Sequence, residues 1–361
     1  MEETTKKPVS HDSSISLNHE VEEFLLKRGA IKVGFATCET LAGGPPSTDL
    51  SYILSEACSA ISFALPLDHD KIRAFLSKKD FMSHERDNLE TNTKVDTISK
   101  ELAKWLKDKG FSSKALRSNN VYRKEVPGWQ VKMPPDLSHR YIAVRSGVGS
   151  FGWSGNVGVK GYGTAIILGS LVSSAKFLPT DPVPPEESFC TKCKLCVSSC
   201  AGEMFDQNEE TTVTLGGQTF SYSKRINTMR CQFVCGGFTG LHPNGKWSTW
   251  SPGRFDIPKD DIKLRSSLLR GISKYRKWPE RSDGVGNFQN PAVEGLSLRL
   301  TCGNCGIMCF GNKEDTLKNY RLLTDSGCVI QREDGEILVL PADEAAKVFS
   351  DMDAKHKRLY Q

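Results

Sequence analysis

Seven of the twelve cysteines fall into two short runs, and their spacing constrains this chain more than any other feature. The first run is Cys190-x2-Cys193-x2-Cys196-x3-Cys200. The second is Cys302-x2-Cys305-x3-Cys309. It lacks one cysteine of the same pattern, and Cys231 lies upstream to supply it. Cysteines two residues apart wrap a tight loop around one centre, whereas a cysteine three residues further on is carried away into a helix. The spacing therefore predicts two compact metal-binding loops.

The order of the first run is that of bacterial two-cluster ferredoxins, which predicts two [4Fe–4S] clusters held by eight thiolates. Because the last cysteine of each run reaches the neighbouring cluster, the thiolates divide into two groups. The first thiol group is Cys190, Cys193, Cys196 and Cys309, and the second thiol group is Cys200, Cys231, Cys302 and Cys305. Two other interpretations remain open: structural zinc, which usually takes two C-x2-C pairs, and disulfides, which belong to secreted chains.

The remaining cysteines divide by context. Cys235 follows Cys231 by four residues and competes with it for the eighth ligand position. Cys38, Cys58 and Cys328 stand in apolar or strand-like stretches, where a free cysteine is most often a small buried hydrophobe. We assign no chemistry to these three.

Length and composition describe an ordinary globular protein. With 361 residues the chain is long enough for two domains, and its 38% hydrophobic and 25% charged residues are typical of soluble proteins. A net charge of +5 is compatible with an anionic partner such as RNA but does not indicate one. Residues 1–17 lack the apolar core of a signal peptide, and no apolar run approaches the roughly 20 residues of a membrane span. We therefore expect a cytoplasmic protein with reduced thiols and no membrane contact.

Helical and strand patterns alternate in the first half, which predicts an α/β domain. Asn18 is a candidate N-cap of the first helix. Buried strands are expected at 31–36 and 60–65, and a long helix through 95–106. The predicted organisation is a disordered segment 1–17, a first domain 18–180, a cluster domain 181–330 with an insertion 236–300, and a C-terminal extension 331–361.

Two segments have more than one interpretation. The insertion contains Trp247, Trp250 and Trp278 and a basic run at 263–277, which either bind bases and phosphates or form a solvated helix packed on its own domain. The glycine-rich stretch 144–174 forms either tight turns or backbone held close to a large flat ligand. Residues 147–152 match G-x-G-x-x-G, but no acidic residue follows at the spacing of a dinucleotide site.

The segments 146–156, 161–163 and 168–172, which lead into the first cysteine run, resemble the core of the cobalamin-dependent reductases. This group comprises epoxyqueuosine reductase and the reductive dehalogenases, and residues 45–50 and 61–66 are also similar to the epoxyqueuosine reductases. The resemblance implies a nitroreductase-like α/β domain that binds cobalamin without a protein ligand to cobalt, followed by an α+β ferredoxin-like domain with two [4Fe–4S] clusters. In agreement, the chain has no D-x-H-x-x-G motif for histidine ligation of cobalt.

The resemblance also implies site residues. It favours Cys231 over Cys235 as the eighth cluster ligand. The residues implied to line the corrin are Gly147, Gly149, Ser150, Gly152, Gly155, Asn156, Gly161, Tyr162 and Gly163.

The chain matches these reductases less well at the position of their proton donor. Epoxyqueuosine reductases have an aspartate before the glycine loop, where this chain has Met133. The nearby candidates are Tyr141, Tyr122, Asp136 and His139. Reductive dehalogenases use a tyrosine, which ranks the two tyrosines first and Tyr141 before Tyr122. The alternative is that Tyr141 is a core aromatic residue and His139 a surface residue.

These observations predict a reductase that passes electrons from an external ferredoxin or flavodoxin through two clusters to cobalamin and on to a small-molecule substrate. The absent aspartate and the long insertion favour a small molecule over the alternative, tRNA epoxyqueuosine. A non-catalytic electron carrier that activates the corrinoid of a partner is the other alternative.

Overall fold

A computed structural model describes residues 11–117, 121–129, 133–253, 257–275, 277–282, 288–289, 297–298, 301–358 and 360. The elements up to the end of the central sheet are α1 (His11–Leu26), β1 (Lys32–Thr37), α2 (Cys38–Leu41), η1 (Pro46–Thr48), η2 (Leu50–Tyr52), β2 (Ser59–Pro66), α3 (His69–Leu76), α4 (Met82–Asp108), β3 (Ser113–Ala115), α6 (His139–Arg145), β4 (Ser150–Phe151), β5 (Val157–Gly158) and β6 (Ile166–Ser173). The later elements are η3 (Pro185–Glu187), α7 (Leu195–Ser198), β7 (Phe205–Leu215), β8 (Gln218–Arg225), α8 (Thr228–Cys235), α9 (Asp261–Tyr275), β9 (Phe288–Gln289), β10 (Ser297–Leu298), α10 (Asn304–Ile307), α11 (Lys313–Thr324), β11 (Cys328–Gln331), β12 (Ile337–Leu340), α12 (Ala342–Asp351) and α13 (Ala354–Lys357).

The central sheet has the strand order β1-β2-β6-β3, and each neighbouring pair is antiparallel. β2 is buried along nearly its whole length, and β1 and β6 are mostly buried. Because both faces of the sheet are covered, these strands have continuous apolar sequences rather than alternating ones. The predicted mixture of helices and strands is confirmed, with the strands expected at 31–36 and 60–65 present as β1 and β2.

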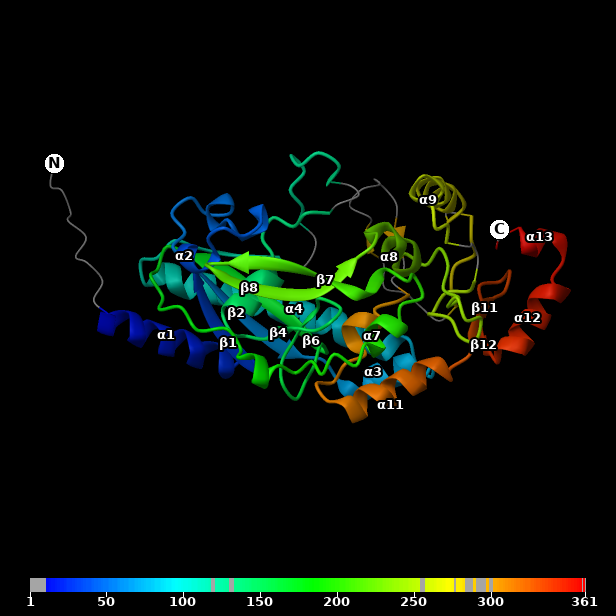
Figure 1. The fold of residues 1–361 in the computed structure, drawn as a ribbon, viewed down its shortest axis with the longest axis horizontal. Helices are drawn as coiled ribbons and strands as arrows, with labels where there is room; N and C mark the ends of the chain where they lie inside the picture. Colours follow the sequence, from blue (N-terminus) through cyan, green and yellow to red (C-terminus); the bar gives the residue numbers. More distant parts are fainter. Residues whose placement is uncertain are drawn as a thin grey trace.

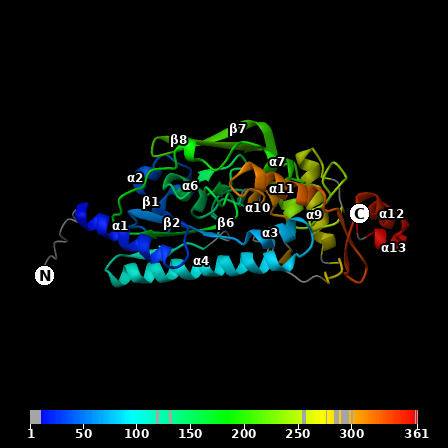
Figure 2. The ribbon, with the colours of Figure 1, turned by 90° about the horizontal axis from the view of Figure 1, so that it is seen from below.

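Helices cover the two faces of the sheet, with α4 on one side and α6 on the other (Figure 2). The core under α1 and α4 contains large side chains, including Leu25, Phe63 and Leu102. On the α6 side, β2 presents small residues, such as Ala60 and Ala64, which lets α6 pack close to the sheet. This asymmetry positions α6 and the glycine-rich stretch that follows it directly against the strands.

The N-terminal prediction needs correction. Helix α1 begins at His11, so 11–17 is helical rather than disordered, and 1–10 lies outside the described residues. Asn18 is inside this helix and does not cap it; its side chain donates to the Leu178 carbonyl and accepts from the Leu178 amide at 2.8 and 3.1 Å. The proline-rich segment 178–185 is therefore fastened to the first domain, where the Thr180 amide also donates to Phe35.

The hairpin β7–β8 follows the first cysteine run and extends back over the first domain (Figure 1). Its turn is Gly216-Gly217, and both residues have positive φ (55° and 80°), as a tight two-residue hairpin turn requires. The Gly216 amide donates to the Ala42 carbonyl, and Tyr222 packs on Phe151 with ring centroids 4.7 Å apart. The cluster domain thus shares an apolar core with the first domain.

The insertion contains buried aromatic residues and one exposed basic helix. Trp247 and Trp250 belong to an apolar core and are 0% and 6% exposed, and the partly buried Trp278 packs against Phe238. The basic run corresponds largely to α9, whose Lys263, Arg265 and Arg270 are exposed. Parts of the insertion, at 254–256, 276, 283–287, 290–296 and 299–300, lie outside the described residues. The interpretation that the two buried tryptophans stack on bases is wrong.

The C-terminal extension begins at the end of β11 and contains β12, and α12 packs on the hairpin β11–β12. Figure 1 shows these elements and α13 at the opposite end of the molecule from α1. Within the described parts of the chain, no helix has the length and apolar character needed to cross a membrane.

Candidate redox site

The first cysteine run forms a tight loop because two of its lysines adopt left-handed backbone conformations. Lys192 and Lys194 have φ of 53° and 59°, values that non-glycine residues rarely adopt. These reversals turn Cys190, Cys193 and Cys196 towards the same side of the loop. Cys196 lies in the short helix α7, and Cys200 follows the end of that helix and does not line the cavity of the other three.

The first thiol group surrounds a small cavity. Cys190, Cys193, Cys196 and Cys309 all line it, together with Cys305 of the second thiol group. The Trp153 amide donates to the Cys190 sulfur at 3.3 Å, and the Thr316 hydroxyl to the Cys309 sulfur at 3.6 Å. The structure therefore brings Cys309 from the second run to three cysteines of the first run.

The second thiol group is also brought together. The charges of Cys200, Cys231 and Cys302 act on Cys305, and Cys231 and Cys305 pack against the same apolar residues, including Met204 and Phe205. All twelve cysteines lie in the described residues and are free thiols, so none forms a disulfide. Among the described residues, no three histidine, cysteine or acidic side chains converge at a point that would ligate a single metal ion.

Cys235 lies one helical turn after Cys231 on α8, and the two sulfurs are 3.4 Å apart. Hydrogen bonds to Cys231 and Cys302 raise the pKa of Cys235 well above its ordinary value. Cys231, by contrast, also acts electrostatically on Cys200 and Cys305. Both candidates for the eighth ligand thus lie beside the second thiol group.

Two cationic residues lie beside the second thiol group. Burial raises the pKa of Cys305 well above its ordinary value, and the charge of Arg225, at the end of β8, acts in the opposite direction. A hydrogen bond from Cys235 and, less strongly, the charge of Arg225 lower the pKa of Cys231. The Nε of Arg225 is buried without a hydrogen-bond partner in the described structure. Lys78 is 7% exposed, donates to the Ser326 hydroxyl at 2.5 Å and interacts electrostatically with Cys302; burial lowers its pKa to about 7. Buried cations of this kind compensate the negative charge of clustered thiolates.

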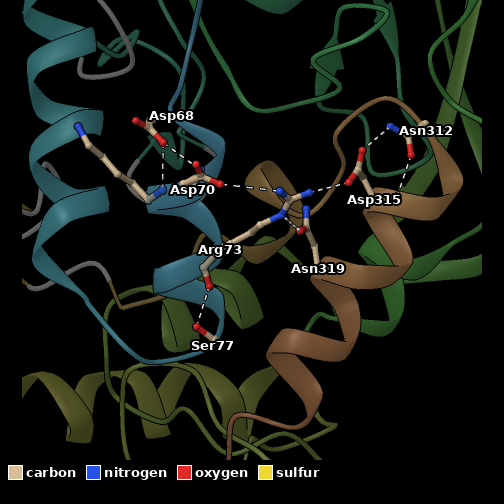
Figure 3. Close-up of polar contacts among 8 residues, drawn as sticks. Asp68, Asp70, Arg73, Ser77, Asn312, Asp315 and Asn319 are labelled. Atoms are coloured by element: carbon tan, nitrogen blue, oxygen red, sulfur yellow. Dashed lines mark hydrogen bonds and ion pairs between the residues drawn. The ribbon is translucent and has the colours of Figure 1, made fainter.

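A polar network clamps the loop that carries Cys309. Arg73 of α3 forms an ion pair with Asp315 of α11 at 2.5 Å and donates to Asn319 at 3.3 Å (Figure 3). Asn319 in turn donates to the Met308 carbonyl at 3.0 Å. Phe310, which follows Cys309, stacks on His69 with ring centroids 3.6 Å apart. Helix α3 of the first domain therefore holds the second cysteine run in place.

The glycines of the predicted corrin-lining set mostly face protein. A Cβ at Gly147 would collide with the Asp181 carbonyl, at Gly149 with the Gly158 carbonyl, and at Gly155 with the Tyr222 ring. Gly152 lies against the Phe189 ring and Gly163 against the backbone of Cys309 and Gly311. Only Gly161 of these six has open space where a Cβ would lie. Glycine is required here because segments of the same chain approach closely.

Of the other predicted cofactor residues, Ser150 and Tyr162 contact protein, and Asn156 lines a cavity. The Ser150 hydroxyl lies 3.0 Å from that of Ser188, and Tyr162 is partly buried at the edge of an apolar cluster. Asn156 donates to the Cys305 carbonyl at 2.9 Å and lines a larger cavity. The glycine-rich stretch therefore docks both cysteine loops, and Asn156 connects this docking surface to the larger cavity.

This larger cavity, termed the α4–α6 cavity, lies between α4, α6, β6 and the loop after Cys302 and has a volume of about 290 Å³. Its volume is at the lower end of the range for small-molecule sites, and it is open to solvent. Polar side chains in its wall are His84, Glu85, Asn88, His139, Arg140, Asn156 and Thr164. The backbone at Gly303 faces open space, and a Cβ at Gly306 would only touch the Asn156 amide at 4.0 Å. The backbone of Gly303 and Gly306 therefore leaves the part of the wall next to Cys302 without side chains of its own.

Of the predicted proton donors, only His139 lines this cavity. Its ring nitrogens lie 3.0 Å from the Ser170 hydroxyl and 3.0 Å from the Arg117 carbonyl. Burial lowers the pKa of His139, which favours the neutral ring. His139 is therefore a fixed internal residue, and the surface interpretation is wrong.

The other three predicted donors lie elsewhere. The Tyr141 hydroxyl is 3.3 Å from that of Tyr222, and burial raises the pKa of Tyr141 to about 12. Tyr141 packs edge-on against Phe151, which fits the core-aromatic interpretation. Tyr122 forms a backbone bridge to Pro135, and the Asp136 carboxylate accepts from the Leu137 amide at 2.7 Å. None of the three lines the α4–α6 cavity.

The sequence analysis missed Glu85 and Arg140. Arg140 donates to the Gly155 carbonyl at 2.6 Å and lies 5.9 Å from the ring centres of Tyr141 and Tyr222. Both residues lie on helices rich in polar residues, so no local pattern distinguishes them from solvent-facing charges. Only the cavity between helices that are distant in sequence reveals them.

Comparison with known proteins gives distant likenesses. No protein-family model matches this sequence, and no curated protein matches it. An epoxyqueuosine reductase solved with an epoxyqueuosine-modified tRNA stem loop is 19% identical with a TM-score of 0.39, over 64% of this chain and 60% of that chain. A reductive dehalogenase whose structure suggests a mechanism for B12-dependent dehalogenation is 13% identical with a TM-score of 0.49, over 93% of this chain and 41% of that chain. These neighbours are reductases, but at such scores the likeness carries no argument about chemistry.

Proposed function

We propose that this protein is an iron–sulfur reductase that delivers electrons to a ligand in the α4–α6 cavity. The observation that carries the proposal is that Cys302 of the second thiol group lines this cavity beside the side-chain-free backbone of Gly303 and Gly306. The first thiol group shares its own cavity with Cys305, so two [4Fe–4S] clusters held by the two groups would be adjacent. Electrons would enter at the first cluster and leave from the second.

Cobalamin is the further cofactor that the sequence resemblance implies. The donor set of the cavity fits the periphery of a corrin: Asn88, Asn156 and Thr164 would bind amides, Arg140 would bind a negative group, and Gly303 and Gly306 would leave room for a flat ring. Cobalamin is larger than the cavity, which is open and does not have to enclose it. When bound, it would supply a cobalt centre that accepts single electrons and reacts with the substrate.

The balanced reaction is the reduction of a small molecule A to AH₂ with two electrons and two protons. The electrons come from an external low-potential donor of the ferredoxin or flavodoxin class, and the clusters store and transfer them singly. The protein contributes binding, orientation and proton supply. Trp247 and Trp250 are buried and are therefore not available to stack on the bases of an RNA substrate. This favours a small molecule over tRNA as the substrate.

The test of this function is anaerobic reconstitution followed by metal and cofactor analysis. About eight iron atoms per chain are expected for two [4Fe–4S] clusters. Cyanocobalamin should then bind at one molecule per chain, measured by its visible spectrum after gel filtration. Zinc in place of iron would contradict the cluster proposal, and full iron without cobalamin binding would favour the non-catalytic electron carrier.

Filling the cavity beside the second thiol group should block ligand binding and spare the clusters. Gly303→Leu is expected to weaken cyanocobalamin binding at least tenfold, because its side chain would occupy open space in the cavity; Gly303→Ala should have a smaller effect. The φ of Gly303 is 176°, outside the left-handed region that favours glycine. Unchanged binding by the leucine variant, with full iron content, would place the cofactor elsewhere.

Cys231 is expected to be the eighth cluster ligand. Cys231→Ser should lose the signal of one cluster in electron paramagnetic resonance, whereas Cys235→Ser should keep both clusters, because the family resemblance puts the eighth ligand at Cys231 and the structure places Cys231 beside the second thiol group. The two residues occupy successive turns of the same helix, so each variant is the control for the other. The opposite result would assign the ligand to Cys235.

A further inference from the structure

Reduction of a bound ligand needs a proton at the place where the electrons arrive. The four residues expected from sequence to supply it are absent from the α4–α6 cavity or, for His139, held by two hydrogen bonds. The proton source must therefore be another group in the cavity wall or water. Among the described residues that line the cavity, Glu85 has the one carboxyl group.

Glu85 lies in the first turn of α4, and Asn88, three residues later on the same helix face, also lines the cavity. Across the cavity are α6 with Arg140 and the loop that begins at Cys302. The Glu85 carboxyl group thus faces the space between the first domain and the second thiol group.

No hydrogen bond or ion pair to the Glu85 carboxyl group is present among the described residues, and burial is the cause that raises its pKa to about 7. A helix N-terminus stabilises a carboxylate and acts in the opposite direction, so burial is the larger effect. A carboxyl group with this pKa is about half protonated at neutral pH, the condition under which a general acid works best.

The other titratable groups that line the cavity do not compete with Glu85 as proton donors near pH 7. Burial lowers the pKa of His84 to about 4 and also lowers that of His139, so both rings are neutral at pH 7. Arg140 remains a cation, and Cys302 is a proposed cluster ligand. Near pH 7, Glu85 is the cavity group that changes its charge.

We infer that Glu85 is a catalytic residue that donates a proton to the ligand reduced in the α4–α6 cavity, an inference that rests on the proposed function. In each turnover two electrons arrive through the clusters, and the O–H bond of Glu85 breaks as a bond forms between that proton and the reduced ligand atom. The carboxylate left on Glu85 takes up a proton from water through the cavity opening. The second proton of AH₂ follows the same route.

The variant that tests this inference is Glu85→Gln, which keeps the size of the side chain and removes its titration. Glu90→Gln is the matched control, because Glu90 is an exposed glutamate on the same helix. Iron content of all three proteins reports whether folding and clusters are intact. Infrared difference spectroscopy between pH 5 and pH 9 should show a protonated carboxyl band with a midpoint near pH 7 in the parent and in Glu90→Gln, but not in Glu85→Gln.

Ligand binding gives the second measurement. Cyanocobalamin has no group that titrates in this range, so any pH dependence of its binding comes from the protein. Covering Glu85 with a ligand favours the neutral acid; affinity should therefore fall above pH 7, by up to about tenfold per pH unit, and stay constant in Glu85→Gln. The inference is overturned if the carboxyl band titrates below pH 5, or if binding has the same pH dependence in the parent and Glu85→Gln. Absence of any cobalamin binding would instead count against the proposed cofactor, while the infrared titration would still decide the state of Glu85.

Discussion

Replacing Cys309 by serine is expected to remove the first [4Fe–4S] cluster and leave the second in place. Cys309 belongs to the second run by sequence, but its sulfur lines a cavity with Cys190, Cys193 and Cys196. Iron content should fall from about eight to about four atoms per chain, and the spectrum of the remaining cluster should match that of Cys196→Ser. The cluster that remains should be the one lost in Cys302→Ser.

The control for this experiment is Cys328→Ser. Cys328 is a buried cysteine on β11 that lines neither cavity, so its replacement should leave both clusters intact. If Cys309→Ser instead reproduced the spectrum of Cys302→Ser, each run would hold its own cluster. The crossing of ligands between the runs would then be wrong.

Gly163→Ala should destabilise the protein much more than Gly161→Ala, although both glycines have positive φ (58° and 87°). Each alanine incurs the cost of a left-handed conformation, about 1–2 kcal/mol. A Cβ at Gly163 would also overlap the backbone of Cys309 and Gly311, whereas a Cβ at Gly161 meets open space. We expect Gly163→Ala to cost about 3 kcal/mol or more in total and to lose the first cluster.

Thermal unfolding and iron content of the reconstituted proteins measure this difference. Gly161→Ala measures the loss of stability caused by backbone strain alone. The additional loss of stability in Gly163→Ala then reports the contact with the Cys309 loop. Equal unfolding temperatures and full iron content in both variants would show that the glycine-rich stretch does not support the cluster site.

Several features follow from local sequence. The cysteine spacing predicted the compact loop of the first run, because a loop around a compact centre is determined by neighbouring residues. The meeting of Cys309 with this loop, and of Cys200 and Cys231 with Cys302, depends on tertiary packing. Strands β1 and β2 and helix α4 were predicted from runs and periodicity of apolar residues, which depend on local burial. The Gly216-Gly217 turn between β7 and β8 carried a local hairpin signal that the sequence analysis did not use.

Other features depend on which segments meet in space. Local pattern indicated that backbone approaches something closely at Gly149 and Gly163, but only the tertiary structure shows that the neighbours are Gly158 and the Cys309 loop. Cys38 was expected to be buried and is exposed at the start of α2.

The candidate acid–base residues show most clearly that a site built from distant segments is not visible in the sequence. Tyr141 and Glu85 are both ordinary residues of helices in the sequence, and their pKa values depend on burial by partners far along the chain. The sequence by itself determined where metal-binding loops and regular elements form, because those depend on neighbouring residues. The tertiary structure decided which side chains share a cavity with the second thiol group, because packing of α4 and α6 against the Cys302 loop joins residues more than 150 positions apart.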